Sequence, residues 1–576
     1  MTSCALPRDC MPRSNTDSAV ILAAYLAWGE ACVERLIGDF AFVIWDGDRR
    51  RVFAARDISG ARQLFYYRDR ERLLIASDRT QLFQDPSIPF EVDEDQLVEF
   101  LTPAYQWTSG WDQGIFQNVY VLDAGCTLRA ERGAVVARRF WEWRDREPDR
   151  RPAGEVIEQY LHTLEEAVRC RLRSRAPRVA VELSGGLDSP AIAALAARLS
   201  GGSAPELHAL SMIFDQFPEV DERQRMQAVL DRYPLVPHFL VADELYRPIY
   251  FEPDWAPRSL LAPHEITGVL AGLAMEQMAA QLGCGVVLTG QMGDSVNGGS
   301  AWVYFGLLRR GDIRELWRRL RIDWGRSRRR TALGLLLHGL LPLGPLPVLR
   351  LGLLAQEYRN GMYTTLPEFL SGNLRDRIRD IDRAIRIRRV GNVQSRCPAV
   401  RTTLAEIILP MGACTVPSSL PLDYRHPYTD RRLVEMVLAM PQELKREAEE
   451  PNAWKAGRLH HRQAMEGIVP EAVRVANPGV DFTPAVRRNL SPAAMREWLL
   501  SESRIHIFER GYVLPDRFVN AIAQSATSQY YVSIMVCVEA WLRALAPGGR
   551  MHELIPARRR PTDGPAAALY SAVAPI

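Results

Sequence analysis

Ser184-Gly-Gly-Leu-Asp-Ser189 is the stretch of sequence that decides the fold. It follows an apolar, β-prone run at 179–183 and precedes Pro190 and a helix-forming stretch at 191–198. Glycines let a backbone approach a phosphate closely, and the free N–H groups of a helix start point at it. Asp188 adds a carboxylate suited to Mg²⁺, and the two serines add hydroxyl donors. The pattern of strand, glycine turn and helix therefore predicts a phosphate site.

The spacing of this loop is not that of a Walker loop, which needs a lysine before the final serine. It resembles the pyrophosphate loop of ATP pyrophosphatases that make acyl-adenylates, in particular the asparagine synthetase family. The synthetase domain of that family is a parallel α/β sheet that splits ATP between its α and β phosphates. The resemblance implies that ATP is bound by Leu183, Ser184, Gly185, Gly186, Leu187, Asp188 and Ser189.

A second glycine-rich motif, Thr289-Gly-Gln-Met-Gly-Asp294, follows the β-prone run at 285–288. It resembles the second metal motif of the same family, T-G-x-G-x-D-E. The resemblance implies that Asp294 shares Mg²⁺ with Asp188 and that Gly290 lies at the nucleotide. Ser211-Met-Ile-Phe214, followed by the adjacent acids Asp221-Glu222, resembles the family's second-strand segment, which implies that Ser211 lies beside the adenosine. Two carboxylates that flank a triphosphate suit a metal-assisted displacement at the α-phosphorus.

Two later segments carry basic candidates. Asp423-Tyr-Arg-His-Pro-Tyr-Thr-Asp430 resembles the family's E-x-R-x-P-F-L-D, which makes Arg425 a candidate for binding phosphate or carboxylate. Arg458-Leu-His-His-Arg-Gln-Ala464 resembles K-x-L-L-R-x-A, whose lysine stabilises the pentavalent phosphorus and the leaving pyrophosphate. Arg458 takes the place of that lysine by register. Lys455 lies one turn earlier on the same predicted helix face and is the alternative.

Departures from the family pattern indicate the acceptor. Gln291 stands where asparagine synthetases have Glu and β-lactam synthetase has Tyr, and Asp423 stands where the family has Glu. Glutamine cannot act as a general base, so neither base arrangement is reproduced. The chain therefore looks most like the lasso peptide cyclases, which adenylate an Asp or Glu side chain of a leader-cleaved precursor peptide. The N-terminal amine of the peptide then attacks and forms a macrolactam.

Three alternatives to a cyclase stay open. The chain could be a small-molecule amide or β-lactam synthetase, or an ammonia-dependent asparagine synthetase. An inactive scaffold in a biosynthetic complex is the alternative of a different class, and the intact Asp188 and Asp294 argue against it. A cyclase implies the core peptide as substrate, with a leader-binding protein and a leader peptidase of the same pathway as partners.

Length and composition limit the class of protein. A chain of 576 residues is expected to form two or more domains, and a net charge of +3 argues against a dedicated nucleic-acid binder. Nine scattered cysteines without a C-x-x-C pair indicate neither a zinc site nor a disulfide framework. With no signal peptide visible at residues 1–9, we expect a cytoplasmic protein.

The N-terminal part reads as a helix over 18–36, with Asp17 as its N-cap, followed by four short strands in an antiparallel meander. The strands are expected at 40–45, 51–55, 63–67 and 72–76. The segments 23–29, 36–46 and 55–62 resemble the back half of a class II glutamine amidotransferase domain of the Ntn type. In that family a cysteine follows the initiator Met. Because Cys4 and Cys10 are interior, we expect a degenerate α+β domain without the nucleophile.

The expected organisation is a degenerate amidotransferase-like domain over 1–143, a charged linker over 144–154 and an adenylating parallel-sheet domain over 155–560. Helices dominate this domain from about residue 300, and a flexible tail is expected over 561–576. Residues 331–349 carry no charged side chain, yet three prolines make buried helices and a loop a better reading than a membrane span. The Arg-rich segment 309–330 is expected to be a solvated helix face, and contact with an anionic membrane or a partner is the less favoured alternative.

Overall fold

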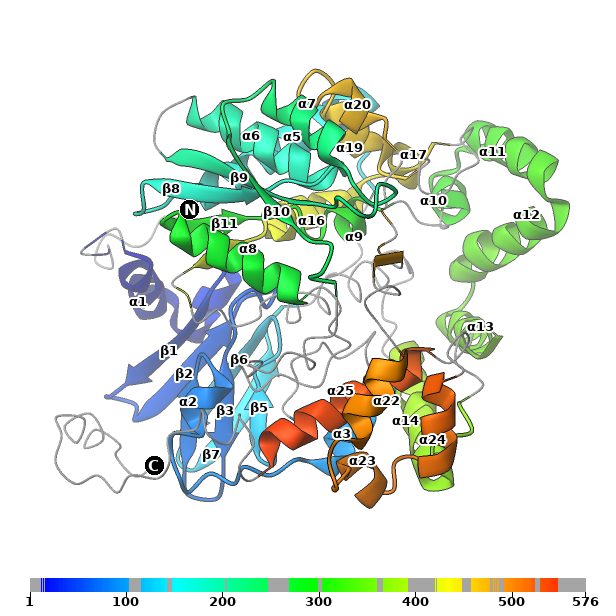
Figure 1. The fold of residues 1–576 in the computed structure, drawn as a ribbon. Coiled ribbons are helices and arrows are strands. Elements are labelled where there is room, and N and C mark those ends of the chain that lie inside the picture. Colours follow the sequence, from blue (N-terminus) through cyan, green and yellow to red (C-terminus); the bar gives the residue numbers. More distant parts are fainter. Residues whose placement is uncertain are drawn as a thin grey trace.

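The computed structural model contains an N-terminal domain with two antiparallel sheets and a C-terminal domain with one parallel sheet and a helical extension (Figure 1). The predicted tail at 561–576 and part of the predicted linker lie outside the residues that the structure describes. Apart from a few isolated positions, the described residues are 16–102, 115–141, 148–201, 205–246, 269–298, 303–359, 366–391, 422–447, 457–476, 492–523 and 529–546.

The four predicted N-terminal strands exist, but a single meander was the wrong arrangement. The first two strands pair with each other, and the next two pair in a different sheet. The crossing is made by the loop 57–64, in which Asp57 accepts the N–H groups of Ser59, Ala61 and Arg62. One sheet has the order β1 (Ala41–Asp46), β2 (Arg51–Arg56), β6 (Cys126–Glu131), β7 (Ala134–Arg139), and the other β4 (Leu73–Ala76), β3 (Phe65–Arg68), β5 (Val119–Val121).

The first helix is shorter than predicted and has a different cap. Helix α1 covers Asp17–Trp28, and the Thr16 hydroxyl accepts the N–H of Ala19, so Thr16 rather than Asp17 is the N-cap. Gly29 adopts φ +59° and ends the helix, because only glycine enters that region without strain. A 3₁₀ segment at Gly29–Glu34 replaces the predicted continuation of the helix.

The parallel sheet predicted for the C-terminal domain is confirmed. Its five strands are all parallel, and the prediction missed the two outer strands. The first of these contains Pro237, a residue confined to sheet edges, and the other is only three residues long. The order is β10 (Val236–Val241), β9 (Glu206–Ile213), β8 (Arg178–Glu182), β11 (Cys284–Leu288), β12 (Asp423–Arg425).

Helices cover both faces of this sheet because its strands are apolar on both sides. Val179 and Val181 of β8 pack in the same core as α5 (Ala153–Arg171), α6 (Asp188–Ser200) and α16 (Arg431–Ala439). Ala180, between them, packs against α8 (Val269–Gln281) on the other face. This arrangement places the start of α6 at the carboxyl edge of the sheet (Figure 1). Smaller helices of this layer are α7 (Arg223–Leu230), α19 (Leu459–Ala464) and α20 (Glu471–Arg474).

The C-terminal helices share a hydrophobic core with the N-terminal domain. Phe116 of the N-terminal domain packs on Trp541, and their ring centroids are 5.8 Å apart.

No helix in the described part of the chain is long and apolar enough to cross a membrane. The remaining helices include α3 (Glu94–Phe100), α9 (Gly293–Asn297), α10 (Val303–Arg310), α11 (Ile313–Arg326), α12 (Arg328–Leu335), α13 (Leu346–Arg359), α14 (Gly372–Gly391), α17 (Gln442–Lys445), α22 (Pro492–Leu500), α23 (His506–Glu509), α24 (Pro515–Ala523) and α25 (Gln529–Leu545).

A buried ionic cluster joins the two domains. The guanidinium of Arg171, at the end of α5, lies 2.9 Å from Asp39 of the N-terminal domain and 2.9 Å from Asp430, the N-cap of α16. Nearby, Arg62 of the N-terminal domain pairs with Asp423 of β12. A buried cation is tolerated only when anions surround it, so this contact fixes the domains relative to each other.

We expect Arg171→Ala to lower the free energy of unfolding by about 3–5 kcal/mol, because two buried carboxylates lose their shared cation. Urea unfolding followed by circular dichroism measures the change. The control is Arg169→Ala on the same helix, whose exposed side chain pairs with Glu166 and should contribute less than about 1 kcal/mol. Equal effects of the two substitutions would contradict the assignment.

Candidate active site

Two loops meet at the carboxyl edge of the parallel sheet, and their backbones touch. The loop 183–187 joins β8 to α6, and the loop 289–292 joins β11 to α9. A Cβ added to Gly290 would lie 2.5 Å from the backbone nitrogen of Ser189, and one added to Gly293 would lie 2.3 Å from Cγ of Asp188. Glycine is therefore required at both positions for the two predicted motifs to come together.

The first loop is held in shape by its own serines. The Ser184 N–H donates to Ser189 Oγ at 2.9 Å, the two serine hydroxyls are 2.8 Å apart, and the Gly186 N–H donates to Ser184 Oγ at 3.3 Å. The Gly185 N–H donates to Glu222 Oε2 at 2.9 Å. Glu222, which follows β9 and precedes α7, thus supports the loop, and no sequence signal predicted this contact.

Arg458 joins the two predicted metal carboxylates. Its Nη1 lies 2.6 Å from Asp188 Oδ2 and also donates to Asp294 Oδ1. Burial raises the pKa of the Asp188 carboxyl to about 7; the Arg458 guanidinium opposes the shift, and the Asp294 carboxylate adds to it. The structure thus brings together three of the residues predicted from separate motifs.

The backbone of Arg458 is strained. It adopts φ +59° directly before α19, a left-handed conformation that costs a residue with a Cβ roughly 1–2 kcal/mol. Its Nη2 is buried and makes no hydrogen bond within the described part of the structure. Strain of this kind is concentrated at functional sites, and the spare donor suits an anion such as a phosphate oxygen.

The two carboxylates also fit a divalent cation. Asp188 Oδ1 is buried and has no hydrogen-bond partner among the described residues, while the side chain of Asp294 is 70% exposed. Carboxylate oxygens are the donors that Mg²⁺ prefers, and these two carboxylates follow neighbouring strands. The chemistry of this donor set agrees with the predicted metal site.

A buried polar network lies under Asp188, where the family motif has two leucines and this chain has His460 and His461. His461 Nδ1 is 3.0 Å from the hydroxyl of Tyr160, and His461 Nε2 is 3.1 Å from the hydroxyl of Tyr428. Tyr428 in turn donates to the backbone carbonyl of Asp188 at 3.2 Å. Burial lowers the pKa of His461 to about 3, so the imidazole is neutral at physiological pH.

The side chains of Asp423 and Arg425 make their contacts away from the two loops, although the backbone carbonyl of Arg425 accepts the Thr289 N–H at 3.2 Å. The Arg425 guanidinium donates to Asp423 at 2.8 Å and, at the end of α5, to the backbone carbonyls of Arg171 and Arg173 at 2.7 and 2.5 Å. Asp423 binds Arg62 of the N-terminal domain. The two side chains therefore serve the domain contact here, and catalytic roles for them stay predictions.

The other predicted residues have mixed positions. Gln291 lies in the second loop, where its N–H donates to Thr289 Oγ1 at 3.3 Å. The Leu183 N–H donates to the backbone carbonyl of Leu210 in β9. Ser211 is buried in β9, and its hydroxyl has no hydrogen-bond partner in the described part of the chain. Lys455 lies outside the described residues.

His426 is a residue of this region that the sequence analysis missed. Its Nδ1 lies 2.7 Å from Thr289 Oγ1, so it ties the end of β12 to the start of the second loop. Burial lowers the pKa of His426 to about 4. The sequence shows His426 directly after Asp423-Tyr-Arg425. No sequence rule, however, predicts that a side chain after β12 contacts the Thr289 hydroxyl after β11.

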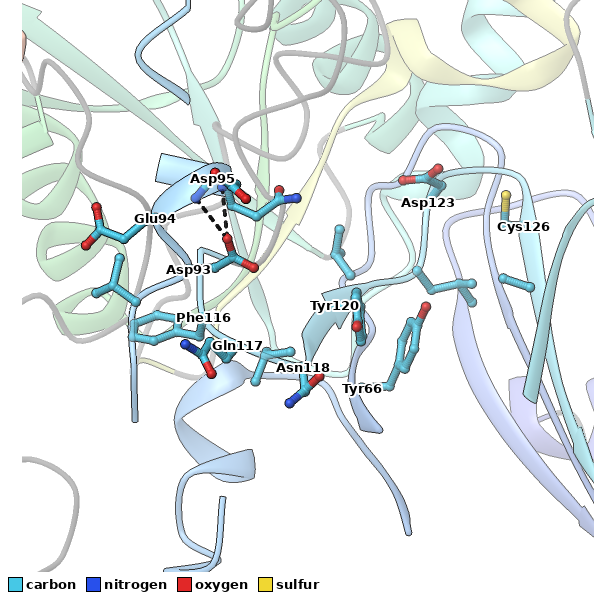
Figure 2. A pocket seen from close by; sticks show the side chains of 16 residues that line it. Tyr66, Asp93, Glu94, Asp95, Phe116, Gln117, Asn118, Tyr120, Asp123 and Cys126 are labelled. Atoms are coloured by element: carbon cyan, nitrogen blue, oxygen red, sulfur yellow. Dashed lines mark hydrogen bonds between the residues drawn. The ribbon is translucent and has the colours of Figure 1, made fainter. Parts of the chain in front are cut away.

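A separate cavity of about 590 Å³ lies in the N-terminal domain along the edge strand β5 (Figure 2), and its described lining residues include none from the two loops. Its acids already have structural partners: Asp93 accepts the N–H groups that begin α3, Glu94 binds Arg510, Asp95 lies 2.6 Å from Arg377, and Asp123 lies 3.5 Å from Arg139. Each acid among the described lining residues is thus engaged in a structural contact.

Comparison with known proteins identifies the family. The asparagine synthase family model matches residues 159–543, which contain both loops, Arg458 and the parallel sheet. The chain belongs to the asparagine synthase family. A glutamine amidotransferase domain model matches residues 6–141, in agreement with the resemblance seen in the N-terminal sequence.

Curated relatives of this asparagine synthase family member include synthetases and amidases. It is 32% identical over 203 residues to asparagine synthetase (glutamine-hydrolyzing) 3 of Bacillus subtilis strain 168, which covers 35% of this chain and 32% of the relative. It is 28% identical over 299 residues to amidase chry2 of Gibberella zeae, which covers 50% of this chain and 43% of the relative. The matches thus span less than half the length of these relatives.

His426 should make stability depend on pH. Its folded pKa of about 4 lies below the unfolded value of about 6.5, so only the unfolded chain binds this proton between the two, and stability is lost as the pH falls through that window. Between pH 7.5 and 5.5 we expect this protein to lose about 1.4 kcal/mol more than His426→Asn, whose side chain keeps a polar atom near Nδ1.

Urea unfolding at the two pH values measures this difference. His162→Asn, at an exposed position of α5, is the control for the loss of a histidine. If His426→Asn and the unsubstituted protein lose the same stability on acidification, the proposed origin of the pH dependence is wrong.

Proposed function

We propose that this protein is an ATP-dependent, AMP-forming carbon–nitrogen ligase. It activates a carboxylate as an acyl-adenylate and transfers the acyl group to an amine. The observation that carries the proposal is the pair of carboxylates, Asp188 and Asp294, that come from neighbouring parallel strands and share Arg458. The glycine loop beside them opens a helix, which favours a bound phosphate.

The residues of the two loops have distinct tasks in this proposal. The N-terminus of α6 binds the phosphates of ATP, since the N–H groups of Ser184, Gly185 and Gly186 already donate within the protein. Mg²⁺, when held by Asp188 and Asp294, neutralises negative charge on the triphosphate. Arg458 provides a fixed positive charge next to the transferred group, and its strained backbone holds the guanidinium at that place.

The reaction has two balanced steps. An oxygen of the substrate carboxylate attacks the α-phosphorus, the bond from that phosphorus to the oxygen bridging to the β-phosphate breaks, and pyrophosphate leaves. The amine nitrogen then attacks the acyl carbon, AMP leaves, and the nitrogen gives up one proton. Holding the two reactants in one pocket can lower the barrier by about 7–11 kcal/mol, which reduces the need for a strong base.

For the substrate we propose a leader-cleaved precursor peptide, so that the protein acts as a lasso peptide cyclase. Gln291, at the position of the family's Glu or Tyr, supports an acceptor that needs no general base from that position, such as a neutral N-terminal amine. A leader-binding protein and a leader peptidase are the proposed partners. The asparagine synthetases among the relatives, which are named as glutamine-hydrolyzing, favour asparagine synthesis as the second candidate. For this chain the ammonia-dependent form is proposed, because Cys4 and Cys10 are interior.

Incubation with ATP and the leader-cleaved peptide of the same gene neighbourhood tests the proposal. We expect mass spectrometry to show a peptide that has lost one water, with AMP and pyrophosphate formed in equal amounts. Asp188→Asn should abolish both. Conversion of aspartate and ammonium to asparagine, without reaction of the peptide, would overturn the cyclase and keep the ligase. Unchanged product formation by Asp188→Asn would overturn the ligase site itself.

Gly293→Ala should reduce ATP–pyrophosphate exchange at least about 100-fold, because the new Cβ would lie 2.3 Å from Cγ of Asp188 and displace that carboxylate. Far-UV circular dichroism should stay unchanged. The control is Gly272→Ala on α8, where an added Cβ meets no atom within 4 Å. Exchange at the normal rate in Gly293→Ala would show that the close approach of the loops does not serve adenylation.

A further inference from the structure

Helix α11 carries a stripe of apolar side chains that are exposed in the described part of the structure. Ile313, Trp317 and Trp324 are 52%, 69% and 48% exposed. Their spacing of four and seven residues places them on one side of the helix, within about 40° of each other. Exposed tryptophans are uncommon on a protein surface, and a row of them marks a contact site more often than a solvated face.

A different side of α11 holds it to the protein. Leu316 and Arg319 are buried, and the Arg319 guanidinium donates to the backbone carbonyl of Arg446 at 2.5 Å. The hydroxyl of Tyr304 donates to Asp323 at 2.5 Å. The side of α11 that packs against the rest of the protein is therefore a different one, and the tryptophans stay exposed while the helix is packed in place.

The exposed side of this region is strongly cationic. Residues 313–330 contain eight arginines and two acids. Arg314 and Arg321 lie beside the tryptophan stripe, and residues 328–330 follow it as three exposed arginines. Within the described part of the chain none of these five arginines makes an ion pair. The prediction of a solvated helix face describes the arginines but not the exposed apolar stripe that they flank.

Further exposed apolar side chains follow the arginines along the chain. Helices α11, α12 and α13 form an arc that extends away from the parallel sheet (Figure 1). Between residues 336 and 351 this arc exposes Leu336, Leu340, Leu343, Val348 and Leu351.

We propose that α11–α13 is a peripheral docking surface for an anionic lipid bilayer. Tryptophan and leucine side chains can enter the headgroup region while the flanking arginines bind lipid phosphates. The exposed apolar residues are spread over successive helical segments, which suits an extended planar surface better than a single peptide segment. No helix in the described chain is long and apolar enough to cross the membrane, so the contact is interfacial. This inference does not depend on the proposed ligase activity.

Co-sedimentation of the full chain with vesicles tests the surface. We expect binding to vesicles of phosphatidylcholine with phosphatidylglycerol, at least about tenfold weaker binding to phosphatidylcholine alone, and loss of most binding at high salt. Tryptophan fluorescence should shift to the blue on binding. Absence of sedimentation with anionic vesicles would overturn the proposal.

Two variants and a control identify the residues responsible. Trp317→Ser with Trp324→Ser, and separately Arg314→Gln with Arg321→Gln, should each weaken vesicle binding at least about tenfold. Trp45→Ser, at a 59% exposed tryptophan of β1, should bind as the unsubstituted protein does. Unchanged binding by both double variants would overturn the assignment. Binding to polyglutamate but not to vesicles would also overturn it and assign the surface to an acidic protein.

Discussion

The buried guanidinium of Arg171 is the constraint on which the relation of the two domains depends. A cation removed from water requires carboxylates on more than one side, and here Asp39 and Asp430 come from different domains. The loop that begins with Asp57 presents Arg62 to Asp423 next to this cluster. The N-terminal domain is thus attached through charges as well as through the apolar core that it shares with α25.

This domain contact continues by short steps to the active-site loops. Arg425 binds the backbone at the end of α5, and the next residue, His426, holds the hydroxyl of Thr289. Thr289 begins the loop that leads to Gly293, the first residue of α9, which packs against Asp188. A domain of amidotransferase type therefore supports the position of the second loop, whatever chemistry it performs itself.

The sequence predicted the features that depend on local rules. The parallel sheet and the meeting of Asp188 with Asp294 follow from strand, glycine and helix signals at the ends of neighbouring strands. The N-terminal meander was wrong because pairing depends on the crossing loop, and β12 was missed because three residues show no periodicity. Asp423 and Arg425 matched a family motif, but their partners are main-chain carbonyls and a residue from another domain, which no single motif encodes.

Arg458 has a further consequence for the proposed chemistry. A lysine at this place would set a primary amine beside a reactive mixed anhydride, and any neutral fraction of it could be acylated. A guanidinium keeps its proton at all physiological pH values and has no free lone pair to attack with. The arginine that joins Asp188 and Asp294 thus supplies charge without competing with the substrate's amine, which protects the enzyme from modifying itself.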